Sequence, residues 1–258
     1  MPVTFITSRE NPHIKAAIRL RNSAAERCAL GKFFLEGFRL CADAFGSGCA
    51  PDELYITAQA RAKYSTASLE QASAQVFEIT ESVAQKLGDT QHPQGVFAVC
   101  GAKEACVDFW QPAGKYIAPE NIQDPGNLGA IARTAEALGL AGLAVGSGCD
   151  PWHPKALRAS MGALLRLPLM RTDSLPAALR ASGLPCYAAV PDRETASVLA
   201  CDFTSGGILV IGSEAGGLTE EALAACKHTI TVPMPGRAES LNAAAAATIL
   251  MWEMVRQT

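Results

Sequence analysis

The 258-residue sequence lacks the features that mark a membrane or secreted protein. No apolar run reaches the roughly 18 residues that a membrane-spanning helix needs. The opening residues, MPVTFITSRENPHIK, do not show the charged and then apolar order of a signal peptide. We therefore expect a cytoplasmic protein with no membrane segment.

Cysteine and histidine are present but scattered. The nine cysteines include no C-x-x-C pair, which argues against a disulfide framework and against a zinc ribbon. Cys149 and His153 have the only helix-like metal spacing, and no further nitrogen or sulfur ligands accompany them. We expect no bound metal.

The net charge of −3 does not by itself indicate a nucleic-acid partner, but the charges are unevenly distributed. Residues 1–39 carry seven Lys or Arg against three acidic residues, whereas residues 104–258 carry eleven against fifteen. This excess allows the N-terminal part to contact phosphate, although a solvated helix face has the same pattern. The candidate contact residues are Arg9, Lys15, Arg19, Arg21, Lys32 and Arg39.

The first hundred residues alternate between short helical and strand patterns and predict a compact α/β unit. The predicted elements are a helix over 11–22, a strand over 33–36, a helix from Phe38, and strands over 53–57 and 96–100. A break over 101–114 lacks periodicity. We therefore predict an N-terminal domain over 1–103, a linker over 104–113 and a second domain over 114–258.

Strand and helix patterns alternate more clearly in the second domain. Apolar strands separated by helices predict a parallel sheet covered on both faces, which is an α/β fold. The predicted strands are 116–118, 142–145, 167–170, 186–190, 208–212 and 229–232.

Three glycine-bearing loops follow strands of this predicted sheet. They are NIQDPGNLGAIARTAEALG at 121–139, LVIGSEAGGL at 209–218 and ITVPMPGRAESLN at 230–242. Because ligands collect outside the carboxyl ends of parallel strands, the three loops predict one composite pocket.

The first loop predicts a helix that starts at Asn127 as N-cap and ends near Gly139. Arg133 lies two positions from Ile131, so it points away from the apolar stripe that packs on the sheet. It is either a solvated arginine or, with Asn127, a group that looks into a cleft and binds phosphate or a ribose edge.

The other two loops have equally open interpretations when each is taken alone. The second fails the dinucleotide fingerprint G-x-G-x-x-G because Glu214 occupies the second glycine position, and a carboxylate there suits a cationic or hydroxyl-bearing ligand. In the third loop, Ser240 is either the N-cap of the C-terminal helix or, with Asn242, a ligand-binding group.

Taken together and in this order, the loops resemble the three motifs of the SpoU/TrmH branch of the SPOUT RNA methyltransferases. The resemblance extends to SMGALLRLPL at 160–169. It also includes NPHIK, FFLEGFRL and HPQGVFAV in the N-terminal part, which is similar to the family's substrate-binding domain.

The resemblance implies a deep trefoil knot in the C-terminal domain, S-adenosylmethionine as cofactor, and a homodimer whose active site lies near the subunit interface. The residues it implies at the cofactor site are Gly212, Glu214, Gly216, Ile230, Val232, Met234, Ser240 and Leu241. Those that match the family's functional polar positions, and are the candidate catalytic residues, are Asn127, Arg133, Glu214, Ser240 and Asn242.

The implied reaction is methyl transfer to a ribose 2′-hydroxyl of RNA, with ribosomal RNA preferred to transfer RNA because of the N-terminal resemblance. Arg133 is then expected to orient the hydroxyl and stabilise the developing alkoxide, while phosphate or water takes the proton. One alternative is an RNA-binding or ribosome-assembly protein that has lost catalysis on the same fold. A dinucleotide-dependent oxidoreductase fits the α/β pattern but lacks the phosphate fingerprint.

Overall fold

The computed structural model describes residues 3–103 and 109–257. By its contacts the chain divides into two compact units. The N-terminal unit consists of Met1–Lys103 and Trp152–Arg158, and the C-terminal unit consists of Glu104–Pro151 and Ala159–Thr258. Part of the predicted linker, residues 104–108, lies outside the described residues, and the predicted domain boundaries stay predictions.

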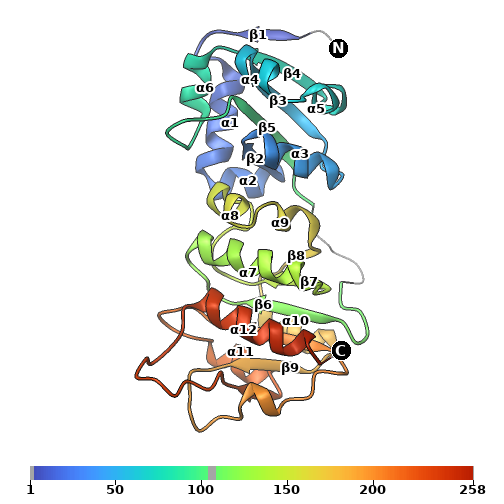
Figure 1. The fold of residues 1–258 in the computed structure, drawn as a ribbon, viewed down its shortest axis with the longest axis vertical. Coiled ribbons are helices and arrows are strands. Elements are labelled where there is room, and N and C mark those ends of the chain that lie inside the picture. The colour runs from blue at the N-terminus through green and yellow to red at the C-terminus, as the bar shows by residue number, and fades with distance from the viewer. Residues whose placement is uncertain (1–2, 104–108, 258) are drawn as a thin grey trace. The chain divides into compact units, whose positions relative to one another are not determined.

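A mixed five-stranded sheet, in the order β1-β4-β3-β5-β2, forms the centre of the N-terminal unit (Figure 1). β4 pairs in parallel with β1 and β3, and β5 pairs antiparallel with β2 and β3. The strands are β1 (Thr4–Ile6), β2 (Lys32–Glu36), β3 (Pro51–Thr57), β4 (Gln75–Ile79) and β5 (Val96–Gly101). The helices are α1 (Pro12–Asn22), α2 (Ala24–Leu30), α3 (Phe38–Gly46), α4 (Ala58–Lys63), α5 (Ala67–Ala72) and α6 (Glu81–Leu87).

Helix α1 shows how local sequence builds this unit. The Asn11 side chain accepts a hydrogen bond from the His13 backbone N–H, and Pro12 occupies the first turn, where its missing N–H costs nothing. The helix buries Ile14, Ala17 and Leu20, which belong to a core with aromatic side chains of the sheet. The predicted helix over 11–22 is confirmed.

The segment Trp152–Arg158 belongs to the N-terminal unit although it lies far along the chain. The Trp152 ring stacks on Phe33 of β2, with centroids 4.8 Å apart. Arg158 donates to Asp89 over 2.7 Å. These contacts explain why this segment does not cluster with its neighbours in sequence.

A fully parallel six-stranded sheet, in the order β11-β9-β10-β6-β7-β8, forms the centre of the C-terminal unit. The strands are β6 (Lys115–Pro119), β7 (Gly142–Val145), β8 (Leu169–Arg171), β9 (Cys186–Ala189), β10 (Gly207–Ile211) and β11 (His228–Ile230). The helices are α7 (Pro125–Ala137), α9 (Ala163–Arg166), α10 (Leu175–Ser182), η1 (Val198–Ala200), α11 (Glu220–Ala225) and α12 (Ala243–Val255). Helix α8 (Pro154–Ala159) lies, except for its last residue, in the segment Trp152–Arg158 of the N-terminal unit.

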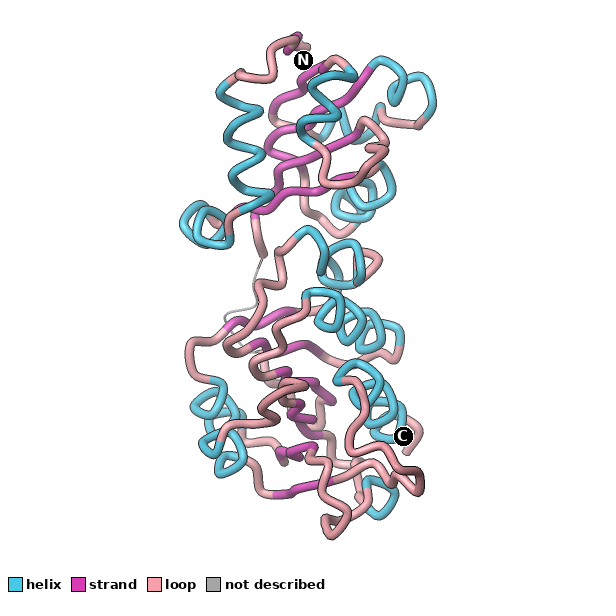
Figure 2. The backbone as a smooth tube through the Cα atoms, turned by 90° about the vertical axis from the view of Figure 1, so that its left-hand side faces the viewer, coloured by secondary structure: helices cyan, strands magenta, loops and turns pink. Residues whose placement is uncertain are grey.

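Helices cover both faces of this sheet, as Figure 2 shows. α7 and α12 contact β6 and each other, and α10 and α11 lie over a core that includes Tyr116, Ile208 and Val210. Such strands, covered on both sides, read as apolar runs in the sequence. The predicted parallel α/β sheet, accompanied by an N-terminal α/β unit, is confirmed.

The start of α7 and the end of β6 each contain a proline. α7 begins at Pro125, with Asp124 at its N-cap, so the prediction of Asn127 as N-cap is wrong. Proline is favoured in the first turn, and Asn127 is thereby left inside that turn with its side chain available for other contacts. Pro119, an unusual strand residue, is the last residue of β6.

Candidate functional site

A pocket of about 520 Å³ lies at the carboxyl ends of β9, β10 and β11. Its walls come from the second and third glycine-bearing loops, from the start of α12, and from Val190 and Pro191 after β9. This is the edge of a parallel sheet where ligands collect. All eight predicted cofactor residues line it: Gly212, Glu214, Gly216, Ile230, Val232, Met234, Ser240 and Leu241.

The second loop folds sharply because Gly212 occupies the position directly after β10. A side chain at Gly212 would place its Cβ 2.1 Å from the backbone carbon of Gly217, so only glycine allows the two backbone segments to approach this closely. Gly217 has a left-handed φ of 64°, and Ser213 and Gly217 exchange backbone hydrogen bonds of 3.1 and 3.0 Å. The loop is thereby closed, and Glu214 lies at its turn.

Side-chain hydrogen bonds connect the three loops. Asn127 of the first loop donates to Glu214 Oε1 of the second, and Asn242 of the third donates to Asn127 Oδ1 over 3.2 Å. The Asn242 Oδ1 atom in turn accepts from the backbone N–H groups of Ala244 and Ala245, at 3.0 and 3.2 Å. Asn242 is therefore the N-cap of α12, and the interpretation of Ser240 as that cap is wrong.

Arg133 occupies a different position from the other candidate catalytic residues. It is exposed on α7, as its spacing predicts, and it does not line the pocket of its own chain. The neighbouring Thr134 lies 3.4 Å from Thr248 of α12, measured between their hydroxyl oxygens. Glu136, one turn further along α7, accepts a hydrogen bond of 2.7 Å from Arg166 of α9. This hydrogen bond holds the pKa of Glu136 below its ordinary value.

Sequence reasoning missed Glu239, a second carboxylate that lines the pocket, and it missed the contribution of Val190 and Pro191. The strand over 186–190 was predicted, so the rule that places ligands at carboxyl ends could have found the residues after it. Glu239 carried no comparable signal, because a lone glutamate before a helix is typical of a first turn.

The six basic residues predicted to contact phosphate mostly have partners inside the N-terminal unit. Lys15, Arg19 and Lys32 form ion pairs with Glu10, Glu26 and Asp52, at 2.7, 3.1 and 2.9 Å. The remaining three are Arg9, which donates to Ser82, Arg21, which donates to carbonyls at the end of α6, and Arg39, which is exposed on α3. These partners reduce the positive field of the segment, and its RNA contact stays a prediction.

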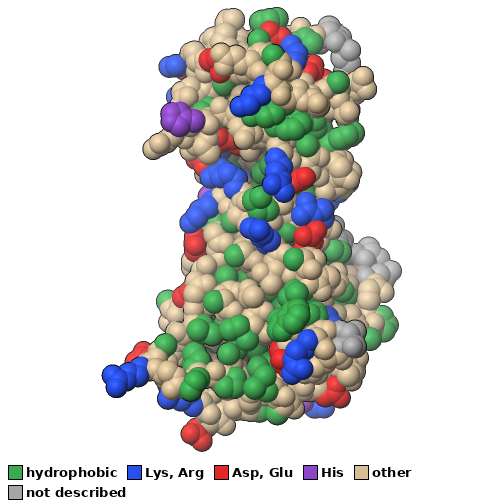
Figure 3. Space-filling view, viewed as in Figure 1, with side chains coloured by type: hydrophobic (Ala, Val, Ile, Leu, Met, Phe, Trp, Pro, Cys, Tyr) green, Lys and Arg blue, Asp and Glu red, His purple; other side chains and the backbone are tan. Residues whose placement is uncertain are grey.

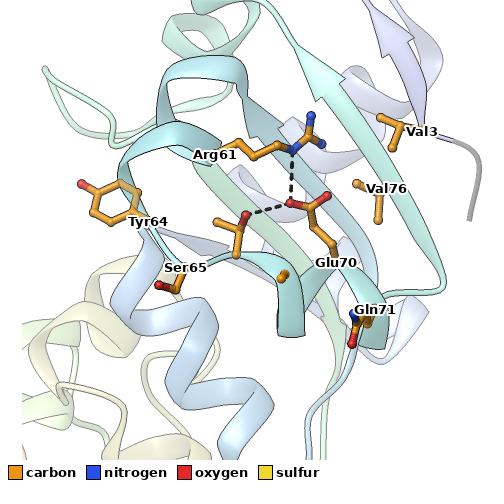
Figure 4. Close-up of a pocket in the computed structure, with 9 residues that line it drawn as sticks. Val3, Arg61, Tyr64, Ser65, Glu70, Gln71 and Val76 are labelled. Carbon is orange, nitrogen blue, oxygen red and sulfur yellow. Dashed lines mark hydrogen bonds and ion pairs between the residues drawn. The ribbon is translucent and has the colours of Figure 1, made fainter.

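The N-terminal unit has a larger pocket, of about 720 Å³, which is shown in Figure 4. Arg61 points to Glu70 there, its Nε donating over 3.1 Å, and the Thr66 hydroxyl donates to the same carboxylate over 2.7 Å. Arg61 also pairs with Glu78. Because these polar groups bond mainly to each other, the pocket offers little chemistry to a ligand.

No group of three or more His, Cys, Asp or Glu side chains suited to a metal ion occurs within residues 3–103 and 109–257. In the same described part of the chain, no helix has the length and apolar character needed to cross a membrane.

The family model of the SpoU rRNA methylase family matches residues 114–252, more than half of the sequence. The chain belongs to this family. The model of the MRM3-like substrate binding domain matches residues 11–98. The SpoU match contains all three glycine-bearing loops and the hydrogen bonds that join them.

Two relatives and one solved structure align with this chain over nearly their whole length. An uncharacterized tRNA/rRNA methyltransferase of Synechocystis is 32% identical over 99% of this chain and 94% of its own. The 23S rRNA (guanosine(2553)-2'-O)-methyltransferase RlmP of Bacillus subtilis is 30% identical over 96% of this chain and 98% of its own. The AdoMet-bound rRNA methyltransferase of Sinorhizobium meliloti has a similar structure, with a TM-score of 0.87, 28% identity and 98% coverage of both chains.

Proposed function

We propose that this protein transfers a methyl group from S-adenosylmethionine to a ribose 2′-hydroxyl of ribosomal RNA. The observation that carries the proposal is the hydrogen-bonded chain Glu214–Asn127–Asn242, which joins the three family motifs beside one pocket. Membership of the SpoU family and the RNA ribose methyltransferase activity in the name of its Bacillus subtilis relative support it.

The pocket has the chemical character that S-adenosylmethionine requires. Apolar side chains such as Ile230 and Leu241 can cover an adenine ring, and the carboxylates of Glu214 and Glu239 complement a cationic ligand. Those carboxylates would repel the pyrophosphate of a dinucleotide, which disfavours the oxidoreductase alternative. When bound, S-adenosylmethionine supplies a methyl group on a positively charged sulfur that is a good leaving group.

The protein's own residues then have two tasks, which are to orient the ribose hydroxyl and to assist the loss of its proton. Asn127 donates to Glu214 and accepts from Asn242, which restricts the position of the Glu214 carboxylate, and Ser240 lines the pocket. We propose that the Arg133 guanidinium contacts the 2′-oxygen of the ribose that is methylated. A guanidinium is always charged in proteins, so it donates hydrogen bonds to the developing alkoxide while phosphate or water takes the proton.

We further propose that the C-terminal unit contains the trefoil knot of the family and that the protein is a homodimer. α12 leaves Trp252 57% exposed and Ile249 41% exposed, beside α7, which carries Arg133. In Figure 3, hydrophobic side chains gather over this part of the C-terminal unit. Pairing of this face with a second copy would bring Arg133 to the subunit interface, where the active site is expected.

The N-terminal unit is proposed to select the RNA, with the basic residues of its first helices near phosphates. Ribosomal rather than transfer RNA is favoured by the match to a substrate-binding domain and by the rRNA relatives. We place the reaction in the cytoplasm and propose no metal. RNA affinity of the full chain should fall steeply with salt, and an affinity insensitive to salt would oppose this role of the N-terminal unit.

Two measurements test the proposed function. Calorimetry should detect S-adenosylmethionine binding, whereas no binding at millimolar ligand would favour an RNA-binding protein that has lost catalysis. Mapping of ribose methylation at nucleotide resolution, in cells with and without the gene, should reveal one rRNA position that loses its methyl group. Loss of a tRNA methylation instead would correct the substrate and keep the reaction.

A further inference from the structure

Met161 has an unusual backbone conformation for a residue with a side chain. Its φ is 51°, in the left-handed region that glycine adopts without strain, and its side chain is 39% exposed. Ser160, before it, is fully buried, and Gly162, after it, is also left-handed, with a φ of 82°. The turn therefore directs a large apolar side chain into solvent at an energetic cost that glycine would avoid.

This turn is anchored in the C-terminal unit on both sides. The Ser160 carbonyl accepts from the Ala163 backbone N–H over 3.0 Å, at the start of α9. The Met161 carbonyl accepts from Arg166 Nη2 over 3.4 Å, and Arg166 Nε donates to Glu136 of α7 over 2.7 Å. The Met161 carbonyl, the Arg166 guanidinium and the Glu136 carboxylate therefore connect this turn to α7.

Arg133 lies on α7 one turn before Glu136, the residue that Arg166 contacts. Residues three apart on a helix lie on neighbouring parts of its surface, so Glu136 and Arg133 face the same side. Arg133 is exposed, as is Met161. Because α7 and α9 contact each other, the exposed Arg133 on α7 and the exposed Met161 on the turn before α9 belong to neighbouring elements.

We propose that Met161 is a positioning residue that packs against an unpaired base of the RNA substrate, next to the ribose that Arg133 faces. The proposal rests on the proposed function, because that function brings RNA to Arg133. Proteins recognise single-stranded RNA by stacking its splayed bases on aromatic side chains, unstacked bases are also held between apolar side chains, and cations bind the backbone. The polarizable thioether of methionine adapts to such a surface. The substrate class is accordingly an RNA loop or bulge with an unstacked base.

Substitution of Met161 by glycine separates this role from a structural one. Met161→Gly removes the side chain and the backbone strain together, so the thermal midpoint should stay the same or rise. The KM for unmethylated rRNA, purified from cells that lack the gene, should increase roughly tenfold, the scale of one lost base contact. The kcat and the affinity for S-adenosylmethionine should change little. Met161→Leu keeps an apolar side chain and should largely restore the KM.

Three outcomes would overturn the proposal. They are a lower thermal midpoint of Met161→Gly with an unchanged KM, equal KM values for the leucine and glycine variants, and a change in oligomeric state, which would make Met161 a protein contact. Fluorescence anisotropy with the same rRNA compares the binding of wild type and Met161→Gly without turnover. Inactive wild-type protein would contradict the proposed function, while equal RNA affinities in this measurement would contradict the role of Met161 alone.

Discussion

Gly212 is the residue at which the pocket tolerates no side chain. In Gly212→Ala the new Cβ would lie 2.1 Å from backbone of Gly217, so the second loop must open. Overpacking of this kind costs about 1–3 kcal/mol, and we expect S-adenosylmethionine affinity to fall about tenfold or more in calorimetry. Gly236→Ala, in the third loop, adds a Cβ with no atom within 4 Å and is the matched control. Equal affinities of the two variants would contradict this account of the loop.

Arg133 is the residue whose role depends most on chemistry rather than packing. Arg133→Lys keeps the charge and loses the planar fork, so turnover should fall by roughly a hundredfold, the scale of losing one donor to a developing oxyanion. Binding of S-adenosylmethionine should be unchanged, because Arg133 does not line the pocket of its own chain. Arg180→Lys, at an exposed position on α10, controls for the general effect of the exchange. Near-wild-type turnover of Arg133→Lys would remove the assigned role.

At the scale of elements, Asn242 has two roles, because it caps α12 and also donates to Asn127 in the hydrogen bonds beside the pocket. Asn242→Ala removes the N-cap and the hydrogen bond to Asn127. Loss of an N-cap costs about 1 kcal/mol of stability. We expect that cost together with weaker S-adenosylmethionine binding, measured by thermal unfolding and calorimetry. Ser174→Ala removes the N-cap of α10, which lies away from the pocket, and should lower stability alone. Weakened cofactor binding in both variants would indicate a general effect of stability.

Elements with a strong local pattern were predictable from the sequence, and those that depend on distant contacts were not. The predicted strand over 142–145 matches β7. A short apolar run between turn residues is too short for a helix and is typical of a buried strand. β1 was missed because three residues at a sheet edge form a strand only through pairing with β4. The association of Trp152 with Phe33 likewise has no local signal. At the site, motif order identified Asn127, Glu214 and Asn242, but the bonds among them needed coordinates.

At the scale of the whole molecule, the exposed face of α12 makes assembly testable. Trp252 and Ile249 are three residues apart on this helix, so they form one apolar surface beside α7. Burial of such a surface against a second copy is favourable, and a charge placed there opposes it because an unpaired charge is costly to bury. Trp252→Glu should therefore convert a dimer to a monomer in light scattering.

The monomeric variant should also lose methyl transfer, because Arg133 would no longer lie at a subunit interface. Phe5→Glu, which introduces the same charge at a 67% exposed apolar residue of β1, should leave both assembly and turnover unchanged. A Trp252→Glu protein that is monomeric and fully active would show that each chain completes its own active site. In that case Arg133 would have to reach the 2′-oxygen from its own α7, and the proposed link between assembly and catalysis would be wrong.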